Sequence, residues 1–390
     1  MSRAGVEVLV VGGGVIGAAV AAELAPDRDV LLLEREHVGA GASALAAGEV
    51  TMTPSYSDYP RIAEHANRFF AALSGTGSFE YHPRPSLELV PPERADAARR
   101  RADRLAGEGI AVSFLEPAAV ENRHPRFDLS GYAGAISHEE TGFLDPYTLT
   151  VTLADMAEER GATVETGRGA TGLLVDNGDV VGVTTERGPI PAETVVVALG
   201  WRTERFLREY VSLPVRPYRT QIVVLEPPDP LPEDFPMGWI PGRHVYFKPE
   251  PNGDLLVGGF SAAVEEPATA SDQVDEAFRN HVAELVPSTI PGMDGAGFVD
   301  GWAGIDGATP DTRPIIDAPD VAPDGLVVAT GFHGRGVMTA PVAATVVGDL
   351  VRDVEPTLPH EPFRLSRFES RSREFPFTSI SAGTDDYDEP

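Results

Sequence analysis

The start of the chain alternates between apolar runs and glycine in an order typical of a β-α-β unit. Residues 6–11 are a short apolar run, glycines occupy 12–14, residues 15–24 have an alanine-rich helical composition, and residues 30–33 are apolar again. Short apolar runs bounded by turn residues indicate buried strands, and the longer run between them indicates a helix. The pattern therefore predicts strand, tight turn, helix and strand in succession.

Further along, hydrophobic spacing predicts helices at residues 61–73, 92–105 and 148–160. Shorter apolar runs predict strands at residues 163–165, 170–176, 180–186, 195–199, 221–225, 244–249 and 254–258. Asn177-Gly178 and Asn252-Gly253 have the composition of hairpin turns. A last strand at 326–329 leads through the glycines of 331–336 into a helix at 337–351. The elements thus belong to the α/β class.

Composition narrows the choice of partners and compartment. The chain has 390 residues, with 60 acidic residues against 31 basic ones and a formal net charge of -29. This length favours two domains, or one domain with a large insertion. The acidity argues against nucleic acid or an anionic membrane surface as a partner. No apolar run approaches the roughly 18 residues of a membrane span, and the start lacks a signal-peptide cleavage pattern. We therefore expect a cytoplasmic protein without a membrane span.

Two further features of the composition bear on the habitat and on covalent chemistry. Lys248 is the only lysine, and acidity with arginine in place of lysine leads to the hypothesis of a halophilic protein. At about 1 M salt the Debye length is roughly 3 Å, so that self-repulsion is screened. The chain has no cysteine, which excludes disulfides, thiolate metal sites and cofactors bonded through sulfur.

The first turn carries a nucleotide-binding fingerprint. Residues 12–17, GGGVIG, satisfy G-x-G-x-x-G between a predicted strand and a predicted helix, and Glu34 closes the next strand. Gly12 allows the tight turn, Gly14 lets the backbone approach a pyrophosphate, and Gly17 lets helix and sheet pack closely. Glu34 would accept hydrogen bonds from ribose hydroxyls and repel a 2′-phosphate. The alternative is a glycine-rich turn without function, but strand, helix and acid together favour a dinucleotide site.

The segment after Glu34 decides between FAD and NAD by resemblance. Residues 34–35 (ER) and 39–48 (GAGASALAAG) resemble the second phosphate and flavin loop of the D-amino-acid oxidase superfamily, near its glycine oxidase and sarcosine oxidase branches. The resemblance continues in the family's order through residues 161–162, 180–188, 195–201, 302–304, 309–311, 314–316 and 329–336. It covers nearly the whole chain.

This resemblance implies the domain plan. A Rossmann-like FAD-binding domain is expected from residues 1–50, 145–212 and 300–376. Residues 51–144 and 213–299 are expected to form a substrate domain on a mixed, largely antiparallel sheet. Residues 377–390, which end in DDYDEP, remain as a flexible acidic tail.

The resemblance also implies FAD as the cofactor, held without a covalent bond. Leu45 occupies the position of a flavin-linking histidine in some relatives, and a linking cysteine is lacking. The glycines of 331–336 at the start of the last helix suit the N1 and C2=O edge of a reduced, anionic flavin. The expected cofactor-binding residues are Gly12, Gly14, Val15, Ile16, Gly17, Glu34, Arg35, Ala42, Ser43, Ala47, Gly48, Val50, Ala170, Ala198, Gly200, Trp201, Gly304, Gly331, Gly334, Arg335, Gly336 and Val337.

The substrate pocket departs from the family. An amino-acid substrate calls for a cationic carboxylate anchor, but Met338 and Asp306 stand where a lysine and an arginine anchor relatives' substrates. Arg335 is the preferred replacement, with Arg243 and Lys248 as alternatives; a solvent-facing Arg335 is an equal alternative. Tyr246 and His333 complete the catalytic candidates, although each is compatible with a purely structural role. The remaining histidines lack metal-ligand spacing, so no metal is expected.

The resulting prediction is an oxidoreductase that moves a hydride from the carbon next to an amine nitrogen to FAD. The substrate would be a small amine or amino acid, such as sarcosine, glycine, proline or a D-amino acid. Oxygen and an electron carrier remain alternative acceptors, and homo- and hetero-oligomers both remain open. A flavoprotein subunit that passes electrons to a partner, or a non-catalytic FAD-binding protein, is the alternative function.

Overall fold

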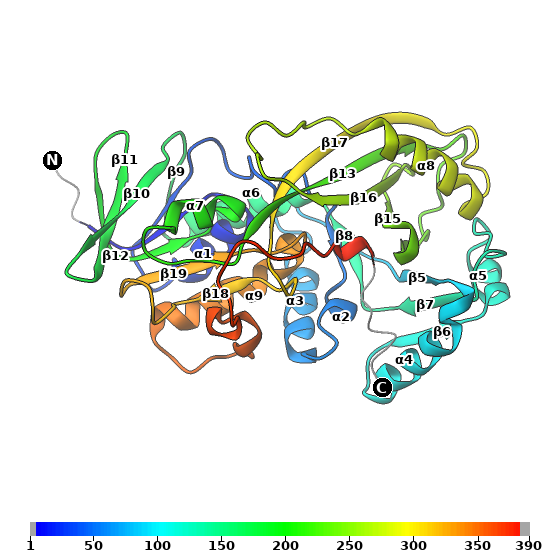
Figure 1. The fold of residues 1–390 in the computed structure, drawn as a ribbon, viewed down its shortest axis with the longest axis horizontal. Helices are drawn as coiled ribbons and strands as arrows, with labels where there is room; N and C mark the ends of the chain where they lie inside the picture. Colours follow the sequence, from blue (N-terminus) through cyan, green and yellow to red (C-terminus); the bar gives the residue numbers. More distant parts are fainter. Residues whose placement is uncertain (1–4, 383–390) are drawn as a thin grey trace.

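The computed structural model describes residues 5–382 and has two lobes joined by crossing strands (Figure 1). The first lobe is built on a sheet whose central strands β1 (Val6–Val11), β2 (Val30–Leu33), β9 (Thr163–Glu165), β12 (Ile190–Val197) and β19 (Leu326–Thr330) are parallel. β1 lies between β2 and β12, so that the connections diverge on either side of it. This is the strand arrangement in which α/β sheets bind ligands at their carboxyl edge.

The same sheet continues into antiparallel structure on the side of β12 that faces away from β1. β10 (Ala170–Asp176) and β11 (Asp179–Thr185) extend it beyond β12, and β18 (Ile315–Asp317) pairs with β19. The hairpin turn falls at Asn177 and Gly178, which both have positive φ. This is the turn chemistry that the sequence predicts at that position.

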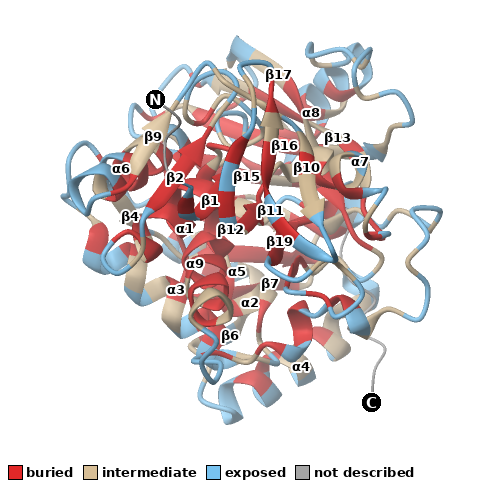
Figure 2. Ribbon diagram, turned by 90° about the vertical axis from the view of Figure 1, so that its left-hand side faces the viewer, coloured by how far each residue is buried: buried red, intermediate tan, exposed pale blue. Residues whose placement is uncertain are grey.

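Helices α1 (Val15–Leu24), α6 (Pro146–Glu159) and α9 (Gly336–Arg352) pack together against the parallel sheet. Nine of the ten residues of α1 are buried, because this helix is enclosed by the sheet and by the other two helices. Figure 2 shows β2 and β19 and most of α1 and α9 as buried. A helix apolar on every side is expected in such a position.

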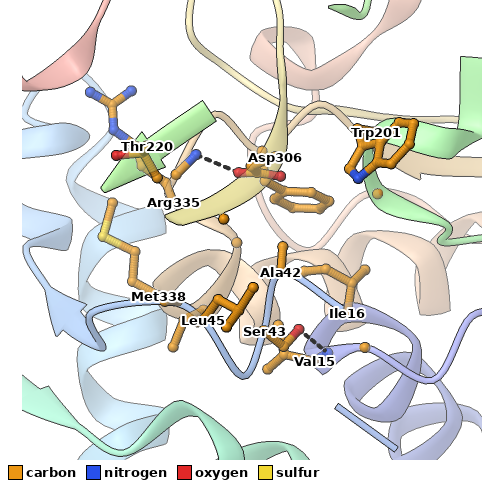
Figure 3. A pocket seen from close by; sticks show the side chains of 18 of the residues that line it. Val15, Ile16, Ala42, Ser43, Leu45, Trp201, Thr220, Asp306, Arg335 and Met338 are labelled. Carbon is orange, nitrogen blue, oxygen red and sulfur yellow. Dashed lines mark hydrogen bonds between the residues drawn. The ribbon is translucent and has the colours of Figure 1, made fainter. Parts of the chain in front are cut away.

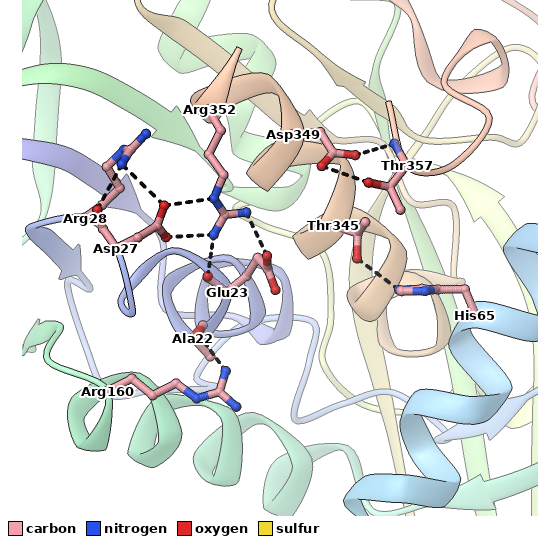
Figure 4. Close-up of polar contacts among 10 residues, drawn as sticks. All are labelled: Ala22, Glu23, Asp27, Arg28, His65, Arg160, Thr345, Asp349, Arg352 and Thr357. Atoms are coloured by element: carbon pink, nitrogen blue, oxygen red, sulfur yellow. Dashed lines mark hydrogen bonds and ion pairs between the residues drawn. The ribbon is translucent and has the colours of Figure 1, made fainter. Parts of the chain in front are cut away.

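Ion pairs also connect α1 to the end of α9 (Figure 4). Arg352 places Nη1 2.8 Å from Glu23 and Nη2 2.9 Å from Asp27. The guanidinium lowers the pKa of Asp27, and the two acids raise the pKa of Arg352. Because these groups are partly exposed, the contribution to stability is about 1 kcal/mol or less per pair. Burial of α1 and α9 therefore dominates this contact.

The second lobe is a sheet in the order β17-β13-β16-β15-β14-β5-β7-β6. Every pairing in it is antiparallel except that of β14 with β5. In chain order its strands are β5 (Ser86–Val90), β6 (Val112–Leu115), β7 (Gly134–His138), β13 (Arg216–Glu226), β14 (Met237–Ile240), β15 (Val245–Pro249), β16 (Leu255–Ala263) and β17 (Gly297–Ala308). The rings of Phe127, Phe235 and Phe247 pack together in the core beside this sheet.

Smaller elements complete the two lobes. A three-stranded sheet of β3 (Glu49–Val50), β8 (Gly142–Leu144) and β4 (Tyr81–Pro83) stands beside α2 (Met52–Ser55) and α3 (Pro60–Leu73). The remaining helices are α4 (Ala95–Gly107), α5 (Pro117–Arg123), α7 (Thr203–Leu207) and α8 (Glu276–Thr289). None of the helices within residues 5–382 has the length and apolarity needed to traverse a bilayer.

The fold class agrees with the prediction, but the end of the chain differs from it. Phe377 stacks on the ring of His333 with centroids 5.6 Å apart, and Trp239 donates a hydrogen bond to the carbonyl of Ser381 over 3.2 Å. Phe377 and Ser381, which belong to the expected flexible tail, therefore contact the folded part of the chain. The other part of that tail, residues 383–390, lies outside the described residues.

Candidate active site

A cavity of about 890 Å³ lies where the two lobes meet. One wall consists of the carboxyl ends of β1, β2 and β12 together with the first residues of α1 and α9. The opposite wall comes from β13, β15, β14 and β5 of the second lobe. The cavity therefore combines the carboxyl edge of an α/β sheet with a roof supplied by a separate sheet.

At the α/β edge the first glycine turn is as compact as the fingerprint requires. Gly12 has φ +113°, and a Cβ there would lie 2.4 Å from the carbonyl oxygen of Ala198. A Cβ on Gly17 would lie 1.8 Å from the carbonyl oxygen of Gly12. Gly12 lines the cavity, whereas Gly17 lies behind it. Gly17 thus acts by bringing α1 close to β1.

Glu34 and Ser43 hold the two loops that flank the start of α1. Glu34 accepts a hydrogen bond from the N–H of Gly13 on Oε2 at 2.7 Å and one from the N–H of Glu36 on Oε1 at 2.9 Å. Ser43 accepts a hydrogen bond from the N–H of Val15 at 2.9 Å (Figure 3). Because the Ser43 oxygen accepts there, its own O–H remains able to donate to an anion at the helix N-terminus.

Arginine and tryptophan side chains border the same part of the cavity. Arg35 pairs with Glu36 at 2.7 Å, and the guanidinium of Arg202 lies 4.1 Å from the centroid of the Trp201 ring. Burial lowers the pKa of Arg202. Arg202 immediately follows the predicted residue Trp201, but nothing in the sequence pattern distinguished it from an ordinary surface arginine.

The loop at residues 39–48 is fixed to the second lobe through its apolar middle. Trp302 donates from Nε1 to the carbonyl of Leu45 over 3.0 Å. A Cβ on Gly304 would lie 3.3 Å from the Cβ of Leu45, so that the strand and the loop are in close contact. Figure 3 shows Leu45, Ala42 and Met338 bordering the cavity. This contact couples the position of the loop to β17.

Most of the predicted site residues line this one cavity. The predicted residues on its surface are Gly12, Gly14, Val15, Ile16, Glu34, Arg35, Ala42, Ser43, Ala47, Gly48, Ala170, Ala198, Gly200, Trp201, Gly304, Gly334, Arg335, Gly336, Val337 and Tyr246. The predicted residues that do not line it are Gly17, Val50, Gly331 and His333. Val50 is fully buried in the core of the first lobe, and Gly331 turns the chain behind the cavity at φ +70°.

Asp306 fixes the second glycine loop in place. Its Oδ2 accepts a hydrogen bond from the N–H of Gly334 and its Oδ1 one from the N–H of Gly307, each at 2.7 Å. Burial raises the pKa of Asp306. The residue at the position of a relative's arginine therefore binds main chain of its own protein. Arg335, the candidate that the sequence analysis preferred, lines the same cavity.

His333 has a different environment from the one expected for a catalytic residue. It is completely buried, its Nδ1 accepts a hydrogen bond from the N–H of Thr309 at 3.3 Å, and its Nε2 lies 2.7 Å from the carbonyl oxygen of Thr378. These partners fix a neutral ring with the proton on Nε2. Burial lowers the pKa of His333 to about 4. His333 ties the glycine loop to residues 377–382 and does not reach the cavity.

The candidate cations are separated by the structure. Arg335 lines the cavity and donates from Nη1 to both the carbonyl and the hydroxyl of Thr312 at 3.1 Å. Lys248 instead contacts Glu250 at 2.8 Å and the ring of Phe143 at 4.8 Å. Arg243 is exposed at a turn away from the cavity. Of these three candidates, Arg335 is the one that lines the cavity.

Tyr246 and Glu49 meet in the part of the cavity under the second-lobe sheet. Tyr246 has room because Gly258 faces its ring; a Cβ there would lie 2.2 Å from the ring. Burial, with the nearby charge of Glu49, raises the pKa of Tyr246. Burial also raises the pKa of Glu49 to about 8, against the opposing effect of Lys248. Sequence reasoning missed Glu49, although it directly follows the predicted Gly48.

Arg101, Glu88 and His138 line another part of the cavity wall. No role was predicted for them from the sequence. Arg101 contacts Glu88 at 2.9 Å, and Nε2 of His138 lies 3.6 Å from the same carboxylate. They come from α4, β5 and β7, which are distant in sequence from every glycine motif. No local pattern could have grouped them. Among residues 5–382 no cluster of histidine and acidic side chains is arranged to hold a metal ion.

The sequence profile of the DAO family, described as FAD dependent oxidoreductase, matches residues 7–350. The chain belongs to this family. Its glycine-rich loops and the cavity between its lobes are those of an FAD-dependent oxidoreductase. The predicted family, enzyme class and cofactor are therefore confirmed.

Similarity extends to proteins of known structure and name. The glycine oxidase of Geobacillus kaustophilus (strain HTA426) is 28% identical over 375 residues, which cover 93% of this chain and 97% of the relative. The crystal structure of glycine oxidase from Geobacillus kaustophilus superposes with a TM-score of 0.84 at 26% identity, covering 94% of this chain and 99% of that one. The D-amino acid dehydrogenase of Rhizobium rhizogenes (strain K84 / ATCC BAA-868) is 30% identical over 76% of this chain and 69% of its own length.

A more distant structure shares the fold. The crystal structure of L-proline dehydrogenase from P.horikoshii has a TM-score of 0.86 and 23% identity, covering 95% of this chain and 99% of that one. The two-lobed fold is thus common to this chain and to that structure.

The residues at the site fit FAD. The backbone at Gly12 and Gly14 and the free O–H of Ser43 face the cavity at the N-terminus of α1, which suits a pyrophosphate. The carboxylate of Glu34 is held by two main-chain N–H groups at the carboxyl end of β2, where a ribose would meet it. The second glycine loop, fixed by Asp306, brings the start of α9 to the same cavity. These residues would bind FAD, which supplies a two-electron acceptor when bound.

Proposed function

We propose that this protein oxidises a small amine or amino acid at the carbon that carries the nitrogen, with noncovalently held FAD as the hydride acceptor. The observation that carries the proposal is the continuity of the cavity. One cavity joins the glycine turns of the α/β lobe to a chamber under the second sheet, lined by Tyr246, Glu49 and Arg335. The named relatives, a glycine oxidase and a D-amino acid dehydrogenase, support an amine as the donor.

The chain's own residues would bind and orient the substrate. Oxidation of an amine requires the α-C–H bond to be held in one orientation and the nitrogen lone pair to be free of a proton. Tyr246 offers a hydroxyl and Arg335 a guanidinium to a substrate in the chamber. The side chains of Leu45, Met338 and Trp239 supply apolar surface that excludes water from it. The product imine would then hydrolyse in solution.

Covalent attachment of FAD is not part of this proposal. Leu45, at the position of the linking histidine in some relatives, has an aliphatic side chain, and the sequence contains no cysteine. Precipitation with acid is expected to release the yellow chromophore into the supernatant. Retention of the colour in the pellet would contradict noncovalent binding.

The electron acceptor after FAD is the second part of the proposal. Oxygen and an electron carrier are both compatible with a cavity that is bordered by an exposed residue, Asp58. A comparison of steady-state turnover with oxygen and with an artificial electron acceptor distinguishes the two. The same purified protein, passed over a sizing column, reports whether it forms homo-oligomers.

Anaerobic titration tests the proposed reaction. The FAD-loaded protein is mixed without oxygen with sarcosine, glycine, other N-methyl amino acids, proline, D-amino acids and carboxylate-free amines, and the visible spectrum is followed. The expected result is bleaching of the flavin band by at least one of these donors. A protein that binds FAD but is bleached by none of them would instead be a non-catalytic FAD-binding protein or would use a different donor.

A further inference from the structure

Glu49 is the acid on the cavity wall whose carboxyl group is left incompletely satisfied. Its Oε1 is shielded from solvent and has no hydrogen-bond partner among the described residues, although the residue as a whole is half-buried. The other acids on that wall are committed: Asp306 accepts two main-chain hydrogen bonds, and Glu88 contacts Arg101. A buried carboxyl oxygen without a partner is costly. Its position in a ligand cavity indicates that a ligand supplies the missing donor.

The backbone directs Glu49 into the cavity. Side chains of neighbouring strand residues point to opposite faces, and Val50, the other residue of β3, is fully buried in the first-lobe core. Glu49 therefore points the other way, and it lines the cavity. Gly48 before it holds φ +80°, where a Cβ would lie 2.0 Å from the carbonyl oxygen of Leu144. The conformation at Gly48 is therefore tightly constrained, and in it the side chain of Glu49 points into the chamber.

The groups around Glu49 do not neutralise it by direct contact. In register, Glu49 lies opposite Phe143 on β8, and Lys248 of β15 stands 4.8 Å from that ring. The lysine is paired with Glu250. The ionisable groups on the elements packed around β3 include Lys248 and Tyr246 on β15, Tyr81 and His82 on β4, and Arg335 at the start of α9.

We propose that Glu49 binds the substrate's ammonium group and takes its proton, so that the chamber is specific for amines that arrive as cations. The Glu49 carboxyl first gives its own proton to the buffer. The N–H of the ammonium then donates to the carboxylate Oε1, the N–H bond breaks, and this proton forms the O–H bond of the Glu49 carboxyl. The electron pair stays on nitrogen, which becomes the neutral amine that oxidation requires. This inference rests on the proposed function, since it assigns a proton acceptor and a substrate charge to the same chamber.

The protonation state of Glu49 without substrate bears on this assignment. Burial raises the pKa of Glu49 to about 8, so that the empty site holds the carboxyl proton at pH 7. An arriving ammonium brings a second proton. The complex keeps only one proton between the carboxyl and the nitrogen, because the positive charge of the ammonium favours the ionised carboxylate. Proton transfer from nitrogen to oxygen within the pair does not change this count. Binding at pH 7 therefore releases nearly one proton to the buffer.

Ligands that cannot be oxidised separate binding from turnover. tert-Butylamine and α-aminoisobutyrate carry no hydrogen on the carbon next to nitrogen, and the second also carries a carboxylate. Their binding to the FAD-loaded protein is measured by calorimetry at pH 7 in two buffers of different protonation enthalpy, which gives the number of protons released. Glu49→Gln keeps the shape of the side chain but cannot ionise. Glu64→Gln, at an exposed acid on α3 paired with Arg68, is the matched control for loss of a charge.

The expected result is release of nearly one proton with the wild type and Glu64→Gln, and none with Glu49→Gln. The affinity of Glu49→Gln for tert-butylamine is expected to fall by at least about tenfold, as for loss of a hydrogen bond to a charged group. Equal proton release and equal affinity in wild type and Glu49→Gln would overturn the assignment. Tight binding of α-aminoisobutyrate alone, with tert-butylamine ignored, would overturn the specificity for the ammonium and favour a carboxylate anchor.

Anaerobic reduction by the best donor adds a second readout. Glu49→Gln is expected to slow reduction at pH 7 by at least about 100-fold, as for loss of a general base, and to recover as the pH rises and the amine becomes neutral in solution. An alkylamine with a pKa near 10 is neutral in only about one molecule in a thousand at pH 7. If Glu49→Gln leaves the pH profile of flavin reduction unchanged, the role of Glu49 as proton acceptor is refuted, but the proposed function is not. Failure of every amine to bleach the wild type would instead refute the proposed function.

Discussion

Protonation of His333 is expected to destabilise the fold in mild acid. The ring is completely buried, with Thr309 and Thr378 as its partners, and burial lowers its pKa to about 4 from the ordinary 6.5. Because the folded pKa lies below the unfolded one, the unfolded chain binds the proton more readily. This contribution to stability is complete above pH 6.5 and declines as the pH falls towards 4.

The size of the effect follows from the two pKa values. Between pH 7.5 and pH 5, protonation of the unfolded state alone lowers the free energy of unfolding by about 2 kcal/mol. The test compares wild type with His333→Gln, whose amide can accept from Thr309 and donate to Thr378 without ionising. Urea unfolding is measured at both pH values for each protein. Between pH 7.5 and pH 5, the free energy of unfolding of the wild type is expected to fall by about 2 kcal/mol more than that of His333→Gln.

The control is His37→Gln, at an exposed histidine, which should follow the wild type at both pH values. If wild type and His333→Gln lose the same stability between pH 7.5 and pH 5, the neutral, buried role of His333 is refuted. A lower absolute stability of His333→Gln at both pH values does not bear on the test, since only the pH dependence isolates the titration.

Further predictions concern cofactor binding, the end of the chain and salt. Gly17→Ala places a Cβ 1.8 Å from the carbonyl of Gly12, so the variant is expected to lose FAD, as measured by the flavin content after purification; full content would contradict the close packing of α1. Glu34→Gln replaces one accepting oxygen by a donor facing an N–H group, so the Kd for FAD should rise at least about tenfold, and an unchanged Kd would count against this role. A chain ending at residue 376 lacks the Phe377 ring and the Thr378 carbonyl and should melt at lower temperature with a higher KM; equal values would show that residues 377–382 are dispensable. If the acidity is an adaptation to salt, the melting temperature should rise as the salt concentration increases from 0.1 to 3 M. A melting temperature that is highest in dilute buffer would contradict that hypothesis.

Local sequence patterns predicted the first lobe well. β1, α1 and β2 lie where the apolar runs place them, and the hairpin between β10 and β11 turns at Asn177 and Gly178. These elements are buried on both sides or closed by a specific turn, so that their periodicity and turn residues record the environment directly. The same reasoning located the glycine turns that line the cavity.

The second lobe shows where such patterns fail. β17 (Gly297–Ala308) is a twelve-residue strand with the sequence GFVDGWAGIDGA, and its glycines and aspartates are residues that strands normally avoid. Its pairing with β13 along its whole length replaces intrinsic preference by tertiary contact. β5 and β7, which bring Glu88 and His138 to the cavity, are short, and α4, β6 and α5 lie between them in the sequence. Their meeting depends on long-range pairing that no local window contains.

The site residues also divide into those that a local motif predicts and those that only the folded structure reveals. The residues of the glycine turns carry a motif with a physical reason, and they line the cavity as expected. His333 belongs to such a motif, but its positive φ of 53° turns its ring away into the protein. Glu49 lies one residue beyond the flavin loop, and only its burial without a partner distinguishes it. Burial and missing partners are properties of the folded chain, which is why the structure was needed to find them.

The most direct test of the account is titration of the apoprotein with FAD, followed by quenching of the flavin fluorescence and by the visible spectrum. The expected result is saturation at one FAD per chain, a yellow product that acid decolourises, and loss of binding in Gly17→Ala. A folded apoprotein that leaves FAD fluorescent in solution at every ratio would contradict the central claim that the cavity between the two lobes is an FAD site.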